Sequence, residues 1–287
     1  WPALPLGLLY LLMLLGNCCL LRAIGARRGL HSPAYQLLAV LALADLGLSL
    51  CTLPTVLPAL CARAASLPSQ ARLAQMFFIH TFSAIESGVL VAMALDRCVA
   101  TCHPLRYGSM LSPSLVPRAG GLIVLRGVSA VLPVAALMAG TASCRPRVLS
   151  HSFCLHQDLL GLLCGDVRVS SLYGLSAVLL TKGLGALAIL LSYVLIAGAV
   201  LGTVPPQARA KAFSTCGSHL CAVLIFYIPH ISLSLIHRFG KHLPPLAPTL
   251  LADAYLLLPP VLNPLVYSWR TKQIRGQIHI LLCQRAA

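Results

Sequence analysis

The sequence predicts an all-α membrane protein, a seven-transmembrane helix bundle with a short interfacial C-terminal helix. Of its 287 residues, 58% are apolar and only 9% are charged. Because an average soluble domain carries about 25% charged residues, most of this surface faces something other than water. Seven long apolar segments and an alternating distribution of basic residues support the same prediction.

A helix needs about 20 apolar residues to cross about 30 Å of hydrocarbon. Seven segments meet this criterion, and we assign residues 1–287 to one transmembrane domain. The first segment has no basic region before it and no small-residue cleavage site after it, so we interpret it as a mature helix. Because the chain starts at Trp1, we expect a further N-terminal segment upstream. The segments lie at residues 4–24, 34–57, 74–99, 120–139, 172–200, 212–236 and 246–268.

An eighth stretch, residues 272–282, is too short to span a membrane. Ile274 and Ile278 alternate with Arg275 and Gln277 at helical spacing. This pattern predicts an amphipathic helix that lies in the inner interface and contacts anionic membrane lipid.

Basic residues orient the bundle. The exits of the first, third, fifth and seventh segments, counting the last residues of each segment with the gap after it, carry twelve Lys and Arg, and the other three gaps hold seven. The positive-inside rule therefore predicts an extracellular N-terminus. The same rule accounts for the net charge of +15, and no aromatic and basic groove pattern indicates a nucleic-acid partner.

The gap after the fourth segment is polar and contains Cys144, Cys154 and Cys164 at ten-residue spacings. The predicted topology places these cysteines outside, where disulfides persist. No metalloprotease, nucleophile-elbow or phosphate-loop pattern occurs anywhere in the chain, so we expect neither an enzyme nor a metal centre.

Five motifs occur in order along the chain: Gly16-Asn17, LHSPAYQLLAVLALADLGLS (30–49), MALDRCVATCHPLRY (93–107), KAFSTCGSHL (211–220) and PPVLNPLVYSWRTKQIR (259–275). They make the chain similar to the odorant receptors, a family of rhodopsin-like G-protein-coupled receptors. The outer loop at residues 150–175 and the segment HRFGKH further resemble the class I branch. The resemblance implies a plasma-membrane receptor that binds volatile, carboxylic-acid-like odorants and activates a stimulatory G protein to raise cyclic AMP.

The resemblance assigns activation roles to two of these motifs. Asp96 and Arg97 would hold the resting state, after which the arginine meets the G protein, and a guanidinium fork suits such an exchange of partners. Asn263, Pro264 and Tyr267 belong to the matching motif of the seventh segment.

Asp45 and Glu86 are acids inside apolar segments, where ionisable groups are costly and mark functional sites. In the resembling receptors these positions, with Asn17 and Asn263, form a polar core that can hold a sodium ion. Two protonated, hydrogen-bonded carboxyl groups are the alternative, and the sequence leaves both open.

An anionic odorant needs a cation, and two residues match the class I pattern. Arg238 lies just past the outer end of the sixth segment, and His80 lies 17 residues, about 25 Å, outward of Arg97. A snorkelling arginine and a core histidine are the alternatives. The rest of the pocket is expected to include Tyr255, with Phe82 or Ser83, Ile225 and Ile228.

Lys182 departs from the family pattern, which has an apolar or small residue there. Three interpretations stay open: a second anchor for the anion, a side chain that snorkels outward, or a damaging substitution.

A second departure concerns the disulfides. The resembling receptors join a cysteine of the third segment to the middle cysteine of the loop, here Cys154, but Arg72 occupies the matching position. Cys144 with Cys164 remains a candidate bridge. Arg72, Lys182 and Cys98, which replaces the usual tyrosine after Arg97, favour an alternative: a receptor-like copy that does not signal. A seven-helix transporter is a weaker alternative.

Overall fold

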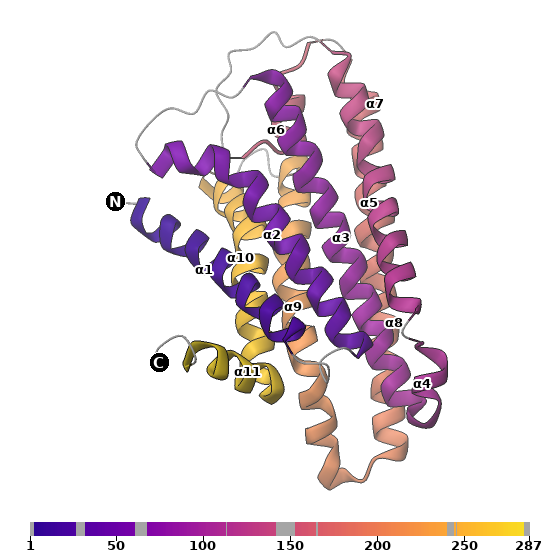
Figure 1. Ribbon diagram of the computed structural model, residues 1–287. Helices are drawn as coiled ribbons and strands as arrows, with labels where there is room; N and C mark the ends of the chain where they lie inside the picture. Colours follow the sequence, from indigo (N-terminus) through magenta and orange to yellow (C-terminus); the bar gives the residue numbers. More distant parts are fainter. Residues whose placement is uncertain are drawn as a thin grey trace.

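The computed structural model describes residues 3–26, 32–60, 68–112, 114–141, 153–164, 166–239, 244 and 246–283. Within this part of the chain, seven helices are long and apolar enough to cross a membrane. The all-α bundle predicted from the sequence is therefore confirmed (Figure 1).

The bundle is built from long helices with short connections. Its long helices are α1 (Ala3–Gly25), α2 (Pro33–Leu60), α3 (Ser69–Cys102), α5 (Leu115–Ala139), α9 (Pro206–Phe239) and α10 (Leu246–Arg270). The fifth span is one continuous helix that consists of α7 (Arg168–Val178), the π-helix η3 (Leu179–Gly183) and α8 (Leu184–Thr203). Short elements are η2 (Pro104–Arg106), α4 (Tyr107–Met110), α6 (His156–Leu160) and α11 (Lys272–Cys283).

Several helices are longer than the apolar segments that predict them. Helix α3 starts five residues before the predicted residue 74, at Ser69, and α9 starts at Pro206 instead of residue 212. A helix satisfies its own backbone hydrogen bonds, so it continues into the headgroup region after the apolar run has ended.

Helix α3 is the most buried of the seven spans and packs against α2, α5, α8 and α9. Large leucines on other helices instead point out of the bundle, as at Leu122 and Leu125 on α5 and Leu187 and Leu190 on α8. Such a continuous exposed apolar belt is what a bilayer requires of a spanning bundle.

Two motifs pack against each other between α1 and α10. A Cβ atom added at Gly16 would lie 3.0 Å from the Cγ atom of Pro264. Gly16 thus permits the close approach of the proline, and the neighbouring Asn17 amide donates to the carbonyl oxygen of Pro260 at 2.9 Å. This hydrogen bond uses a backbone acceptor next to the proline-rich stretch of α10.

Helix α11 lies across the lower end of the bundle beside α1 (Figure 1). Ile274 is fully buried and Ile278 packs against the same cluster, while Arg275 is exposed. Its apolar face is therefore packed on the helices of the bundle, and Arg275 lies on the face that stays exposed.

Candidate functional site

A cavity lies among α3, α5, α6, α7, η3 and α9, and we call it the outer cavity after the orientation predicted from the sequence. Its polar lining includes His80 on α3, His156 on α6, Lys182 on η3 and His230 on α9. Small apolar side chains, including Ala130 and Val131, complete the wall. The cavity encloses about 50 Å³. At about 10–15 Å³ for each water-sized group, it holds roughly four such groups.

Lys182 is the cation of this cavity. Its side chain is only 5% exposed, so it does not snorkel outward to the lipid. The Nζ atom donates to Ser83 Oγ at 2.5 Å and lies 3.2 Å from His230 Nδ1. It also lies 5.1 Å and 5.2 Å from the ring centres of Phe226 and Tyr255. In the described part of the chain, Lys182 has no carboxylate ion-pair partner.

Lys182 lies in the π-helix η3, and hydrogen bonds from neighbouring helices hold the backbone of this segment in place. The wider turn of a π-helix disturbs the regular backbone ladder and is common at functional sites. Here the carbonyl oxygen of Thr181 accepts hydrogen bonds from Ser87 Oγ, at 3.1 Å, and from the Arg126 guanidinium. Side chains of α3 and α5 therefore fix the backbone immediately before Lys182.

His80 connects α3 to the outer loop. Its Nε2 atom accepts a hydrogen bond from the backbone N–H of His156 at 3.3 Å, and the two imidazole rings meet edge to face. The His156 ring pairs in turn with Ser170 Oγ at 3.3 Å. His80 thus makes the hydrogen bond expected of a core histidine and also lines the cavity, and its contact with a ligand stays a prediction.

The other predicted ligand residues have different outcomes. Tyr255 is buried 4.7 Å, centre to centre, from the His230 ring. Ile228 is 57% exposed and faces away from the bundle, so the prediction that it lines the pocket is wrong. Residue 238 belongs to α9, but the side chain of Arg238 lies outside the described residues.

His230 and His156 are the cavity residues that sequence reasoning missed. His230 follows Pro229 within α9, and a histidine inside an apolar span is itself a signal that could have indicated it. Its Nε2 atom is buried without a hydrogen-bond partner among the described residues, as is the hydroxyl of Tyr255.

Gln75 anchors the outer loop at the point where the expected disulfide is missing. Its side-chain oxygen accepts from the backbone N–H of Cys154 at 3.0 Å, and its amide donates to Cys51 O and Thr55 Oγ1. Cys154 is fully buried with a free thiol, and this burial raises the pKa of the thiol to about 12. Arg72, one turn before Gln75, is also buried.

The second predicted bridge is only half described. Cys164 is disulfide-bonded. Cys144 lies outside the described residues. The pairing of the two therefore stays a prediction.

A polar core lies deeper, between α2, α3 and α10. The Asn263 amide donates to both carboxylate oxygens of Asp45, at 3.1 and 3.4 Å, and the carboxyl groups of Asp45 and Glu86 interact directly. Asn17 instead donates to backbone carbonyls, including Met13 O. Within the described residues, Asn17 Oδ1 and Glu86 Oε1 are buried without hydrogen-bond partners.

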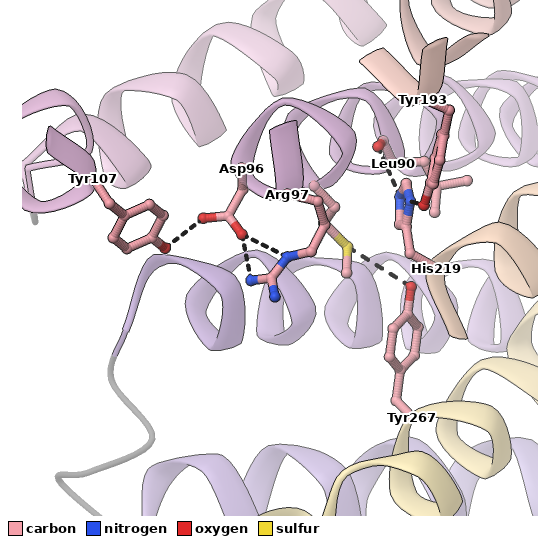
Figure 2. A network of polar contacts seen from close by, with 8 residues as sticks. Leu90, Asp96, Arg97, Tyr107, Tyr193, His219 and Tyr267 are labelled. Carbon is pink, nitrogen blue, oxygen red and sulfur yellow. Dashed lines mark hydrogen bonds and ion pairs between the residues drawn. The ribbon is translucent and has the colours of Figure 1, made fainter. Parts of the chain in front are cut away.

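The inner end carries a closed network around Asp96 and Arg97 (Figure 2). The Arg97 guanidinium donates to Asp96 Oδ2 through both Nε, at 2.9 Å, and Nη2. The Tyr107 hydroxyl donates to the other oxygen, Asp96 Oδ1, at 2.7 Å. Burial and this contact with Asp96 raise the pKa of Tyr107 to about 12. Tyr107 ends a motif that the sequence displays, yet its role was not predicted.

Next to this network lies a wide inner cavity of about 610 Å³. It is bordered by α2, α3, α9, α10 and α11, and its lining includes Arg97, His219, Tyr267 and Lys272. His219 joins Tyr193, at 2.8 Å, to the backbone carbonyl of Leu90, at 3.0 Å (Figure 2). The predicted residue Tyr267 reaches α3 through a long 3.9 Å contact with the sulfur atom of Met93.

Comparison with known proteins identifies this architecture. The family model described as olfactory receptor matches residues 6–285. The chain is 49% identical to olfactory receptor 51L1 of Homo sapiens over 99% of its own length and 91% of the relative. It is 47% identical to olfactory receptor 51G2 of Homo sapiens, over 99% and 90% of the two chains. For olfactory receptor 51E2 of Mus musculus the identity is 45%, over 97% and 87%.

These matches exclude the transporter alternative and agree with the expectation that the chain is not an enzyme, because olfactory receptors are odorant-binding, G-protein-coupled receptors. The seven-helix bundle, with its polar network at the inner end, agrees with that architecture. The chain is a multi-pass membrane protein that belongs to the olfactory receptor family.

Proposed function

We propose that this receptor responds to short carboxylic acids that bind in the outer cavity. The observation that carries the proposal is Lys182, a buried cation without a carboxylate partner in the described part of the chain, in a cavity lined by three histidines. An anionic ligand would supply the missing counter-charge. The cavity volume of about 50 Å³ favours acids with few carbon atoms.

Arg238 is proposed to guide and hold the carboxylate at the outer end of α9. A guanidinium binds a carboxylate through two parallel hydrogen bonds. His80 and Tyr255 are proposed to complete the site below it. In this arrangement the N-terminus is extracellular and the receptor resides in the plasma membrane, so that the cavity opens toward the outside.

At the inner end, Arg97 is proposed to leave Asp96 and meet a stimulatory G protein, which raises cyclic AMP. The closed pair is one state of a two-state element, and the wide cavity beside it offers space for an incoming helix. Asn263, Pro264 and Tyr267 are proposed to move with α10 during this change.

We also propose a sodium site in the polar core. Two neighbouring buried carboxyl groups require a cation or a shared proton. Glu86 Oε1 and Asn17 Oδ1 have no partner among the described residues, so the oxygen atoms present fit a hard cation. Asp45, Glu86 and Asn17 would hold the ion, with Asn263 beside them, and the ion would neutralise charge there and favour the resting state.

The test is a cyclic AMP assay in cells that display the receptor. Acetic acid, which has four non-hydrogen atoms, is expected to raise cyclic AMP in wild type, and Arg238→Ala is expected to weaken this response. Arg168→Ala is the matched control, because Arg168 is an outer arginine with a 92% exposed side chain. An equal response of wild type and Arg238→Ala would contradict the proposed anchor.

A non-signalling copy is a second candidate, favoured by the buried Arg72 and the free thiol of Cys154. It predicts that wild type fails to reach the cell surface. A surface-labelled wild-type receptor that responds to an acid would overturn it.

A further inference from the structure

The surroundings of Lys182 suit a reactive amine as well as an anion anchor. Its Nζ atom contacts Ser83 Oγ, at 2.5 Å, and His230 Nδ1, at 3.2 Å. Both partners can accept a hydrogen bond while remaining neutral. An ammonium ion in a low-dielectric site is costly when no carboxylate lies within ion-pair distance among the described residues, so part of the Lys182 population is a neutral amine until an anion binds. The neutral amine can donate two hydrogen bonds here and keep its lone pair.

The cavity around this amine has the size and chemistry to admit a small carbonyl compound. Its volume of about 50 Å³ corresponds to about four water-sized groups, and a three-carbon aldehyde has four non-hydrogen atoms. Ala84, Val134 and Ala177 in its wall suit a short alkyl chain. His230 Nε2 and the Tyr255 hydroxyl, both buried and unpaired among the described residues, are polar groups beside the amine without partners of their own.

We propose that Lys182 captures short aliphatic aldehydes as a reversible imine. The lone pair of Nζ attacks the carbonyl carbon, and the carbonyl oxygen becomes the hydroxyl of a carbinolamine. The carbon–oxygen bond then breaks, and the oxygen leaves as water with both protons of the amine. His230 Nδ1 lies close enough to Nζ to accept and return a proton during these transfers. Aldehyde and amine give imine and water, so no oxidant or reductant takes part.

This inference rests on the proposed function only in its use of the same outer cavity. It adds a ligand class, the aldehydes, and a covalent mode of binding. It needs neither Arg238 nor a G protein, so it is tested without a signalling readout.

The experiment is reductive trapping on the full-length receptor in membranes. Propanal at a concentration below that of the receptor is added with sodium cyanoborohydride, which converts an imine into a stable secondary amine. Peptide mass spectrometry then compares propylation at Lys182 with that at Lys272, an exposed lysine of α11 in the same molecule. We expect about tenfold more modification at Lys182, because a positioned amine has a higher effective concentration.

Two controls define the result. Unfolding the receptor before the reaction is expected to bring the ratio of Lys182 to Lys272 modification close to one, since the preference depends on the cavity. Lys182→Arg keeps a cation but is expected to lose the modified peptide. Equal modification of both lysines in the folded receptor, or modification of Lys272 alone, overturns the proposal. Because this comparison lies within wild type, it holds even if the variant does not fold.

If trapping succeeds while no acid raises cyclic AMP, the proposed acid response fails and the imine stands. The reverse result removes the imine and leaves the acid response intact.

Discussion

The cations at the outer and inner ends of the bundle have different partners: Arg97 is paired with a carboxylate, whereas Lys182 is not paired with one among the described residues. At the inner end, Arg97 is closed by Asp96 on the same helix, and Tyr107 takes the remaining carboxylate oxygen. At the outer end, Lys182 has only neutral hydrogen-bond partners and two aromatic rings. We call the network of Asp96, Arg97 and Tyr107 the latch, and its charges are balanced within the protein. The charge of Lys182 is not balanced by an ion pair in the described part of the chain, and we propose that a ligand balances it.

The largest effect is expected from replacing Arg97, the cation of the latch. Arg97→Ala is expected to abolish ligand-dependent cyclic AMP production, since the arginine is the group proposed to meet the G protein. Surface labelling and aldehyde trapping at Lys182 report on the outer end and are expected to persist. A variant that still signals would show that the two ends are not joined through Arg97.

The next effect concerns the anchoring of the outer loop. Arg72→Cys places a thiol one turn before Gln75, whose side chain already holds the backbone of Cys154. A bridge to Cys154 is expected to stabilise the receptor by about 2–4 kcal/mol and to raise its surface level. Arg72→Ser is the matched control, because it removes the same charge without a thiol. Equal surface levels of the two variants would exclude the bridge.

A smaller effect is expected at the outer cation. Lys182→Met removes a charge-assisted hydrogen bond worth about 1.5–3 kcal/mol, so the potency of a short acid is expected to fall about 10- to 100-fold. The potency of the corresponding alcohol is expected to change much less, because an alcohol carries no charge. Dose–response curves for both ligands decide this, and parallel losses would argue for a folding defect. Arg168→Met is the surface control, because the Arg168 side chain is 92% exposed.

The smallest effect is expected from the neutral member of the latch. Tyr107→Phe deletes one hydrogen bond to Asp96, worth about 1 kcal/mol, or roughly a fivefold shift toward the active state. Basal cyclic AMP is expected to rise at equal surface expression. A lower basal level would mean that Tyr107 supports the active state instead.

The residues of the inner network were easier to predict from the sequence than those of the outer cavity, for a physical reason. Asp96 and Arg97 are neighbours, and their hydrogen bonds follow from one short motif. The outer cavity joins Ser83, Lys182 and His230, which are far apart in the sequence and meet only through packing of three helices. Without that packing, Lys182 had three open interpretations, His230 was overlooked, and Ile228 was placed on the wrong face.

The ends of the helices and the π-helix within the fifth span could not be predicted from the sequence. Hydropathy identifies the apolar core of each span, so the number and order of the spans were predictable. It does not detect the polar turns that extend α3 and α9, nor the five residues of η3 within the fifth span. A π-helix differs from an α-helix by one residue in a turn, a difference too small to alter an apolar pattern.

That single residue sets the rotational phase between the two halves of the fifth span. Each α-helical residue turns the chain by about 100°, and a π-helical turn holds one residue more than an α-helical turn. If Leu179–Gly183 became α-helical with no residue removed, α7 and α8 would therefore turn relative to each other by about that angle. A helix that keeps its inner half in register would then carry Lys182, or the outer loop attached to α7, to a different face. A change of helix type within five residues can therefore turn the outer half of this receptor without changing any residue of the inner half.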